Sequence, residues 1–341
     1  MREGRAPGRE TIESEIAFME SEAVSLRRVH VTDLHQVLPY LPFLEPEYVQ
    51  LACGNFDAEF FGVEFPHGAA WGSRANLGFL GTAGVPPGYQ LFAFSVPGSE
   101  DRWDGRLVDQ NGLAVGYGNR AIQHRAGDNH RIMGWMFPSD LYIRVAEKLG
   151  MDDVLPQGEP WVAADVRGLR NLLKEIFAHA AMSQFDASLL EFYETALIEL
   201  TLSTLHQAGS RQNGCRLRTG LATEVRRWLD AKAESCVNVS QLCAEFGISE
   251  RTLRHHFALE FDVSPSQYHQ AVRLSRARES LLASNPRKGV ISQVATTLGF
   301  WHMGRFGEQY RRYFGETPSE TLQRAPSNSG RGFFSLRGVA D

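Results

Sequence analysis

Arginine side chains alternate with aromatic rings in LGFWHMGRFGEQYRRYFGETPSETL, residues 298–322. If this segment is helical, Phe306 and Tyr310 lie one turn apart and form an apolar face. Three arginines then lie away from that face: Arg305, Arg311 and Arg312. Guanidinium groups donate hydrogen bonds to phosphate oxygens and to base edges. The segment therefore predicts a helix that is buried on one side and binds an anionic partner, such as nucleic acid, on the other.

The same segment holds the second copy of an internal repeat. SQLCAEFG at 240–247 matches SQVATTLG at 292–299, an offset of 52 residues. Beyond the glycine the offset becomes 53, and the matched pairs are Phe257 with Tyr310, Phe261 with Phe314 and Pro265 with Pro318. Such self-similarity indicates two copies of one structural unit.

Each copy meets the requirements of a helix-turn-helix. The first helix needs a small residue where its partner crosses, the turn needs a positive φ angle that glycine permits, and the second helix needs apolar anchors one turn apart. In the two copies these residues are Cys243 and Ala295, Gly247 and Gly299, and the pairs Leu253–Phe257 and Phe306–Tyr310. Ser249 is predicted to cap the second helix of the first copy.

The faces opposite the apolar anchors are polar. In the first copy the outward residues are Arg251, Thr252 and His255, flanked by Arg254. In the second copy they are Gly304, Arg305, Glu308, Arg311 and Arg312. This pattern is typical of helices that enter the major groove of DNA. A merely helical domain is the alternative, and two matches at a fixed spacing favour DNA binding over it.

Charge is unevenly distributed along the 341 residues. Residues 1–215 have 17 Lys and Arg against 28 Asp and Glu, whereas residues 216–341 have 18 against 12. A basic C-terminal part inside a chain of net charge −5 favours an anionic partner for that part. Chance clustering is the other explanation.

Several common classes of protein are not indicated. The four cysteines form no C-x-x-C pair and the eleven histidines show no metal-binding spacing, so we expect no metal site and no cofactor. We also expect a cytoplasmic protein without a membrane partner, because the sequence has no long apolar run and its first residues lack a signal-peptide core.

The hydrophobic pattern changes period along the chain. Short apolar segments separated by Gly and Pro predict a β-rich barrel or sandwich, and a later helical period predicts helices at 164–181 and 186–207. The predicted parts are a polar leader at 1–21, an effector-sensing and dimerisation domain at 22–207 (β-rich at 22–140, helical at 161–207), a linker at 208–220, a DNA-binding domain at 221–324 and a flexible tail at 325–341.

Two local patterns in the first domain lead to further predictions. The alternation in FDAEFFGVEF, residues 56–65, slips by one residue, as it would at a β-bulge. In the helix at 186–207, leucines at helical spacing form an apolar stripe. That stripe either covers the β-rich part or forms a dimer face.

Residues 221–324 resemble the C-terminal domain of AraC/XylS-type transcriptional regulators. The resemblance rests on ISQVATTLGF and YRRYFGETP between Ile291 and Pro318, preceded by the first copy, SPSQY and the helical segment YHQAVRLSRARESLL. It implies two helix-turn-helix units, joined by a linker helix, that read neighbouring major-groove segments. The base-facing positions of the family correspond here to Arg251, Thr252, Arg254 and His255, and to Met303, Gly304, Gly307 and Glu308.

The resemblance also implies a role for the first domain. In this family a cupin-like β-barrel followed by helices commonly senses a small molecule and dimerises. The expected protein is therefore an α+β homodimer that binds operator DNA, responds to an effector and activates transcription, with RNA polymerase as a further partner.

The second copy departs from the family pattern at its reading helix, the second helix of the helix-turn-helix, which would enter the major groove. Trp301 and His302 stand where a capping Ser or Asp is common, and Gly304 and Gly307 each cost about 1 kcal/mol of helix propensity. We hypothesise that this unit contributes less base readout. Arg305, Arg311 and Arg312 would then bind phosphates, which position a protein without reading sequence.

No motif in the first 215 residues identifies an effector. The candidate pocket residues are the aromatic and histidine side chains of the β-rich part: Trp71, Tyr89, Phe92, Trp103, His124, His130 and Trp135. Each could equally be plain core. Two other functions are alternatives: control by a protein partner, and a barrel enzyme tethered to DNA, for which the sequence contains no catalytic motif.

Overall fold

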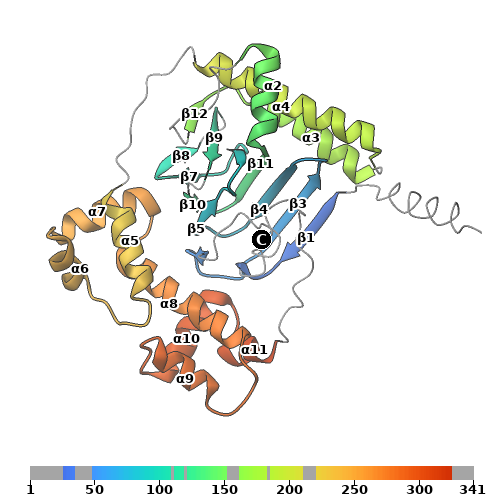
Figure 1. Ribbon diagram of the computed structural model, residues 1–341. Coiled ribbons are helices and arrows are strands. Elements are labelled where there is room, and N and C mark those ends of the chain that lie inside the picture. Colours follow the sequence, from blue (N-terminus) through green and yellow to red (C-terminus); the bar gives the residue numbers. More distant parts are fainter. Residues whose placement is uncertain are drawn as a thin grey trace, which may run out of the picture.

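The computed structural model shows a sheet region, residues 26–209, and a helical region, residues 220–324 (Figure 1). The residues that the structure describes are 26–34, 48–108, 111–118, 121–151, 161–182, 185–209 and 220–324. The predicted leader and tail, and linker residues 210–219, lie outside these ranges.

Two antiparallel sheets form the core of the sheet region. The larger has the order β1 (Arg27–Val31), β3 (Ala58–Glu64), β4 (Ala69–Ala75), β11 (His130–Pro138), β6 (Tyr89–Ser95), β9 (Gly112–Tyr117) and β12 (Trp161–Ala163). The smaller has the order β2 (Val49–Gln50), β5 (Phe79–Gly84), β10 (Ala121–Ala126), β7 (Asp101–Trp103) and β8 (Arg106–Val108). The described strands leave both sheets open at their edges, so of the two predicted forms, barrel or sandwich, a sandwich of facing sheets describes this region better.

The predicted β-bulge in the segment 56–65 is wrong. Strand β3 pairs with β4 in an unbroken register from Ala58 to Glu64. Phe60 packs between the two sheets, whereas Val63 packs on the opposite face beneath the helices. Because both faces of this strand are buried, apolar residues occupy both faces and the alternation breaks without an inserted residue.

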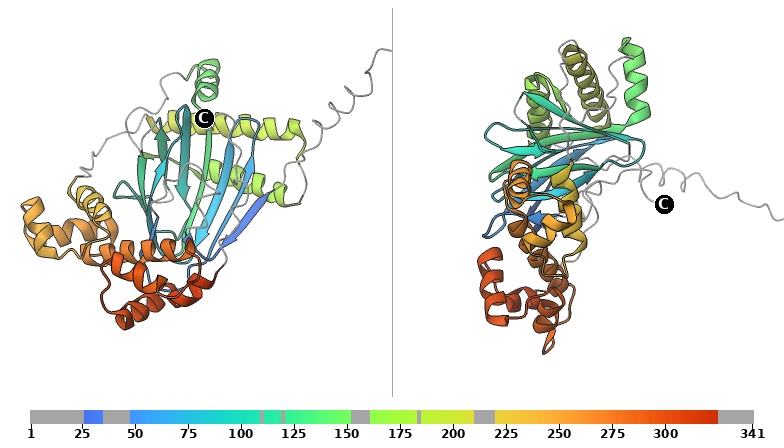
Figure 2. Two further views of the ribbon diagram at one scale, coloured as in Figure 1. Left: turned by 60° about the horizontal axis from the view of Figure 1, so that its bottom comes forward. Right: turned by 90° about the vertical axis from the view of Figure 1, so that its left-hand side faces the viewer.

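Three helices cover the outer face of the larger sheet: α2 (Ser139–Leu149), α3 (Arg167–Met182) and α4 (Ala187–Gly209) (Figure 2). The structure confirms the two predicted helices, as α3 and α4, and adds α2, which the sequence analysis missed. In the α4 stripe, Leu197 and Leu202 are fully buried against this core. The stripe therefore covers the sheet. None of the described helices is long and apolar enough to cross a bilayer.

The helical region contains the two predicted units. The first comprises α6 (Val239–Phe246) and α7 (Glu250–Phe261), and the second comprises α9 (Val290–Thr297) and α10 (Met303–Phe314). Helix α5 (Leu221–Ala231) packs beside the first unit and α11 (Pro318–Gln323) beside the second. The long helix α8 (Pro265–Leu282) runs between the two units (Figure 1).

Helix α8 holds both units through buried polar contacts. Beside the first unit, the Tyr268 hydroxyl donates to Asp230 on α5 at 2.6 Å, and the Tyr268 ring centroid lies 5.7 Å from that of Phe257 on α7. At the second, Arg273 Nε donates to the Leu298 carbonyl at 2.8 Å, and its guanidinium lies 4.2 Å from the Phe300 ring centroid. These contacts fix the separation and orientation of the two units.

Candidate nucleic-acid interface

The first unit has the turn and cap that its sequence predicts. Gly247 adopts φ 62° between α6 and α7. The Ser249 hydroxyl accepts a hydrogen bond from the Thr252 backbone N–H at 3.1 Å and caps α7. Leu253 and Phe257 are buried, so the inner face of α7 is fixed in the core.

The opposite face of α7 is free to meet a ligand. Arg251, Arg254 and His255 are exposed and Thr252 is half-buried. Arg254 forms an ion pair with Glu250 at 2.6 Å. Arg251 has no acidic partner within the described part of the chain, so its guanidinium is the stronger candidate for a base edge or a phosphate.

The second unit shares the turn but lacks the cap. Gly299 adopts φ 73°, and Phe306 and Tyr310 are buried as predicted. His302 occupies the cap position of α10 without a side-chain hydrogen bond to the helix. Trp301, just before it, is 73% exposed. Helix α10 therefore begins with backbone N–H groups that its own sequence does not satisfy.

The outer face of α10 is cationic near its C-terminal end. The predicted contact residues of α10 differ in exposure. The exposed ones are Gly304, Arg305, Glu308, Arg311 and Arg312, and the half-buried ones are Met303 and Gly307. The geometry thus places the predicted DNA-contacting residues of α7 and α10 on sides that face away from the core, except Met303, which packs partly against that core.

Replacing Gly307 with alanine is expected to raise the free energy of unfolding by about 1 kcal/mol. Gly307 lies inside α10, and an added Cβ would meet nothing within 4 Å. The same change at Gly247 should destabilise by about 1–2 kcal/mol, because φ 62° is left-handed. Urea unfolding of the full chain measures both. If the two alanines changed stability in the same direction, this account of the second reading helix would be wrong.

The C-terminal end of α7 docks on the smaller sheet. Asp262 ends the helix in the left-handed conformation, at φ 56°. Its carboxylate lies 3.5 Å from Arg102 on β7 and 3.4 Å from Arg125 on β10. Arg125 Nε also donates to the Phe261 carbonyl at 3.4 Å. Two strands of the sheet region therefore hold the end of the first reading helix.

The C-terminal end of α10 docks on the same region. The Tyr313 hydroxyl donates to the Gln50 carbonyl on β2, and burial raises the pKa of this phenol. In return, the Tyr313 carbonyl accepts from Gln50 Nε2 at 3.2 Å and from the Gly54 N–H at 3.0 Å. Both reading helices thus end against the sheet region.

A buried ion network joins the two regions near α10. Arg278 on α8 donates to the Asp33 carboxylate at 2.5 Å and lies 3.0 Å from Glu316. The side chains of Arg278 and Asp33 are 4% and 1% exposed. Arg324 pairs with Glu316 as well and lies 3.7 Å from Asp33. Nothing in the sequence predicts this network, because its members are up to 291 residues apart.

The candidate effector residues separate into two cores. Five lie on the faces between the two sheets, namely Trp71, Tyr89, Trp103, His124 and His130. Phe92 and Trp135 instead stack on each other beneath the helices, with ring centroids 5.6 Å apart. A ligand held between the sheets would meet the first group only.

His124 and His130 come together with Asp101, a residue that the sequence analysis missed. Burial lowers the pKa of His124 to about 3, so its imidazole is neutral at pH 7. Burial alone would raise the pKa of Asp101, but the adjacent His130, followed by His124 and Ser95, holds this pKa well below its usual value. The three residues lie on three strands with no recognisable spacing in the sequence. Pairing of β7 with β10 and the packing of that sheet against β11 of the larger sheet bring them together.

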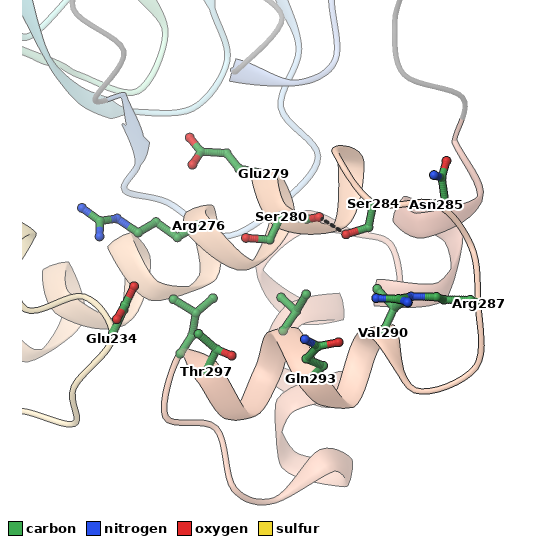
Figure 3. A pocket seen from close by; sticks show the side chains of 12 residues that line it. Glu234, Arg276, Glu279, Ser280, Ser284, Asn285, Arg287, Val290, Gln293 and Thr297 are labelled. Atoms are coloured by element: carbon green, nitrogen blue, oxygen red, sulfur yellow. Dashed lines mark hydrogen bonds between the residues drawn. The ribbon is translucent and has the colours of Figure 1, made fainter.

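A polar groove of about 540 Å³ lies within the helical region, between α8 and α9 (Figure 3). Its lining includes the charged residues Glu234, Arg276, Glu279 and Arg287. Pockets for small molecules are lined mainly by apolar and aromatic side chains. The effector prediction therefore stays with the sheet region.

The sequence is similar to several known proteins. A model of the helix-turn-helix domain family matches residues 242–324. A crystal structure of a probable AraC family transcriptional regulator from Rhodopseudomonas palustris CGA009 shows 33% sequence identity, covering 31% of this chain and 96% of that one with a TM-score of 0.28. The probable thc operon regulatory protein of Rhodococcus erythropolis is 25% identical over 254 residues, 65% of this chain and 74% of the relative.

Another curated relative has a higher sequence identity. XylDLEGF operon transcriptional activator 2 of Pseudomonas putida is 32% identical over 131 residues, which cover 38% of this chain and 78% of the activator. These relatives are transcription regulators, which favours DNA binding over the enzymatic alternative. The chain belongs to the AraC/XylS family of transcriptional regulators.

Proposed function

We propose that this protein activates transcription from an operator when a small-molecule effector binds the sheet region. The observation that carries the proposal is that α7 and α10 both end against that region, at Asp262 and Tyr313. The name of the similar Pseudomonas putida activator supports activation. In this proposal the protein is a homodimer that contacts RNA polymerase, and α4, whose Phe192 is exposed, contributes the dimer face.

Effector control then works as a population shift. On β7 and β10, Trp103 and His124 point between the sheets, whereas Arg102 and Arg125 point outward and hold Asp262. A ligand that favours one arrangement of these strands therefore favours one position of α7. Because helix α8 contacts both units, a change in the position of α7 also changes the position of the second unit.

We assign base readout to the first unit and phosphate anchoring to the second. Helix α7 is capped and presents Arg251 without a local acidic partner. Helix α10 presents Gly304 and Gly307, which have no side chain to read a base, and its exposed arginines can still bind phosphates. The resulting footprint is two adjacent major-groove segments for each subunit, about one turn or roughly 34 Å apart.

Replacing Asp262 with asparagine is expected to uncouple the effector from DNA binding. Asparagine keeps the left-handed conformation but loses its attraction for Arg102 and Arg125. A thermal-shift screen of metabolites identifies the effector, because a ligand of the folded state raises its stability. In the wild type, that effector should change operator affinity by about 5-fold or more. In D262N the change should be much smaller.

The matched control for D262N is Asp165→Asn. Asp165 pairs with Arg167, the first residue of α3, on the surface of the sheet region. D165N should keep the coupling of the wild type. If the effector changed operator affinity equally in D262N and the wild type, coupling through Asp262 would be ruled out. The proposal that the protein binds DNA would still stand.

A further inference from the structure

Three side chains that commonly bind metals converge between the two sheets. Asp101 comes from β7, His124 from β10 and His130 from β11. One potential ligand atom from each lies within 4.8 Å of the other two. All three side chains are buried, with exposures of 0%, 6% and 1%. Charged and ionisable groups are rarely buried unless a partner or a ligand offsets the loss of water.

Neighbouring hydroxyl groups hold two of these side chains in place. One carboxylate oxygen of Asp101 accepts from the Ser95 and Ser99 hydroxyls at 2.7 and 2.9 Å. The other accepts from the Gly127 N–H at 3.1 Å and lies 2.9 Å from His130 Nδ1. His130 Nε2 lies 3.0 Å from the Ser73 hydroxyl. Outer hydrogen bonds of this kind orient the ligands of protein metal sites.

The third side chain lacks such a partner. His124 Nε2 is buried and has no hydrogen-bond partner among the described residues. The same holds for Nε1 of Trp103, whose ring centroid lies 5.0 Å from that of His124. A buried polar atom without a partner costs free energy, and such atoms in a native fold point to a missing ion, water or ligand.

We propose that Asp101, His124 and His130 bind a divalent first-row transition-metal ion, with Zn²⁺ as the representative. Two imidazoles and one carboxylate form a mixed nitrogen and oxygen donor set, which suits such ions, whereas Ca²⁺ and Mg²⁺ prefer oxygen donors alone. On binding, the ion takes the place of the proton between Asp101 and His130 Nδ1. The neutral imidazole of His130 then carries its one proton on Nε2, where the Ser73 hydroxyl accepts it.

The position of the site connects it to the first reading helix. His124 pairs with Trp103 across β10 and β7, and the next pair in the register is Arg125 with Arg102. These arginines hold Asp262 at the end of α7 on the other face of the strands. An ion bound to His124 on the inner face of β7 and β10 therefore also fixes the positions of Arg102 and Arg125 on the outer face. This second statement rests on the proposed function, whereas the metal site does not.

The test uses the full chain, stripped with a chelator and titrated with Zn²⁺ and with Co²⁺. The wild type should bind one equivalent of Co²⁺ with visible absorption, and Zn²⁺ should raise its melting temperature. S73A should weaken Zn²⁺ binding by about 10- to 100-fold, because it removes an outer hydrogen bond. H124F should lose the Co²⁺ spectrum, and it should still fold, since phenylalanine suits a site beside the rings of Phe79 and Trp103.

The control is H30Q, since His30 lies on the surface beside Asp57. It should bind both ions as the wild type does. A wild-type chain that binds neither ion, or an H124F chain that binds them equally well, would overturn the site. If the ion binds through His124 and leaves operator affinity unchanged, the site stands and the connection to α7 is wrong. The D262N experiment judges effector control separately.

Discussion

Replacing Arg278 with alanine is expected to lower the free energy of unfolding by about 3 kcal/mol. The guanidinium lies between the carboxylates of Asp33 and Glu316, and the pair with Asp33 is almost fully buried. Without it, Asp33 loses its nearest cation, while the charge of Arg324 lies farther away, at 3.7 Å. Urea unfolding of the full chain, followed by tryptophan fluorescence, measures the loss.

Two further variants show whether the loss of stability in R278A comes from the buried network or would follow the removal of any arginine. Arg144 pairs with Asp140 on the surface of α2, so R144A should change stability far less. The double variant D33N with R278A should recover part of the loss, because it removes the buried charge that has lost its nearest cation in the single variant. Equal stability of R278A and R144A would show that the network does not hold the two regions together.

Replacing Arg251 with alanine is expected to weaken operator binding by about 1–3 kcal/mol and to relax the preference at one base pair. Arg251 is exposed on a helix that Ser249 caps and Leu253 anchors. R305A should instead weaken binding evenly across sequences and reduce the salt dependence by about one phosphate contact. Affinities for the operator and its single-base variants, at two salt concentrations, distinguish the two.

A surface arginine far from both reading helices serves as the control for this pair. Arg167, the first residue of α3, pairs with Asp165. R167A should leave the operator affinity, the base preference and the salt dependence of binding unchanged. If R305A relaxed the preference at one position while R251A only weakened binding uniformly, the roles of the two units would be reversed.

The helical region could be predicted closely because its rules are local. A positive φ at Gly247 and Gly299, a cap at Ser249 and buried anchors at Leu253 and Phe306 each depend on a few neighbouring residues. Sequence reasoning also found the weakness of the second unit, since the missing cap at His302 is visible in the residue type. No pattern among neighbouring residues in the sequence predicts that both units dock on the sheet region.

The sheet region was harder to predict because its contacts are not local. The apparent bulge in β3 arose from burial on both faces, which depends on helices 100 and more residues away. The Asp101, His124 and His130 cluster depends on which strands pair and on how the two sheets face each other, and no spacing in the sequence reveals it. For the same reason the predicted pocket residues mixed two cores, with Phe92 and Trp135 beneath the helices.

The most direct test of the central claim is selection of bound sequences from random DNA by the full chain, at low and high salt. Two linked reading units predict enriched sites with two short conserved segments about one helical turn apart, repeated when the protein binds as a dimer. Raising salt from about 50 to 200 mM should weaken binding steeply, since neutralised phosphates release counterions. Enrichment of a single conserved segment, or of no sequence, would contradict a duplicated DNA-reading module.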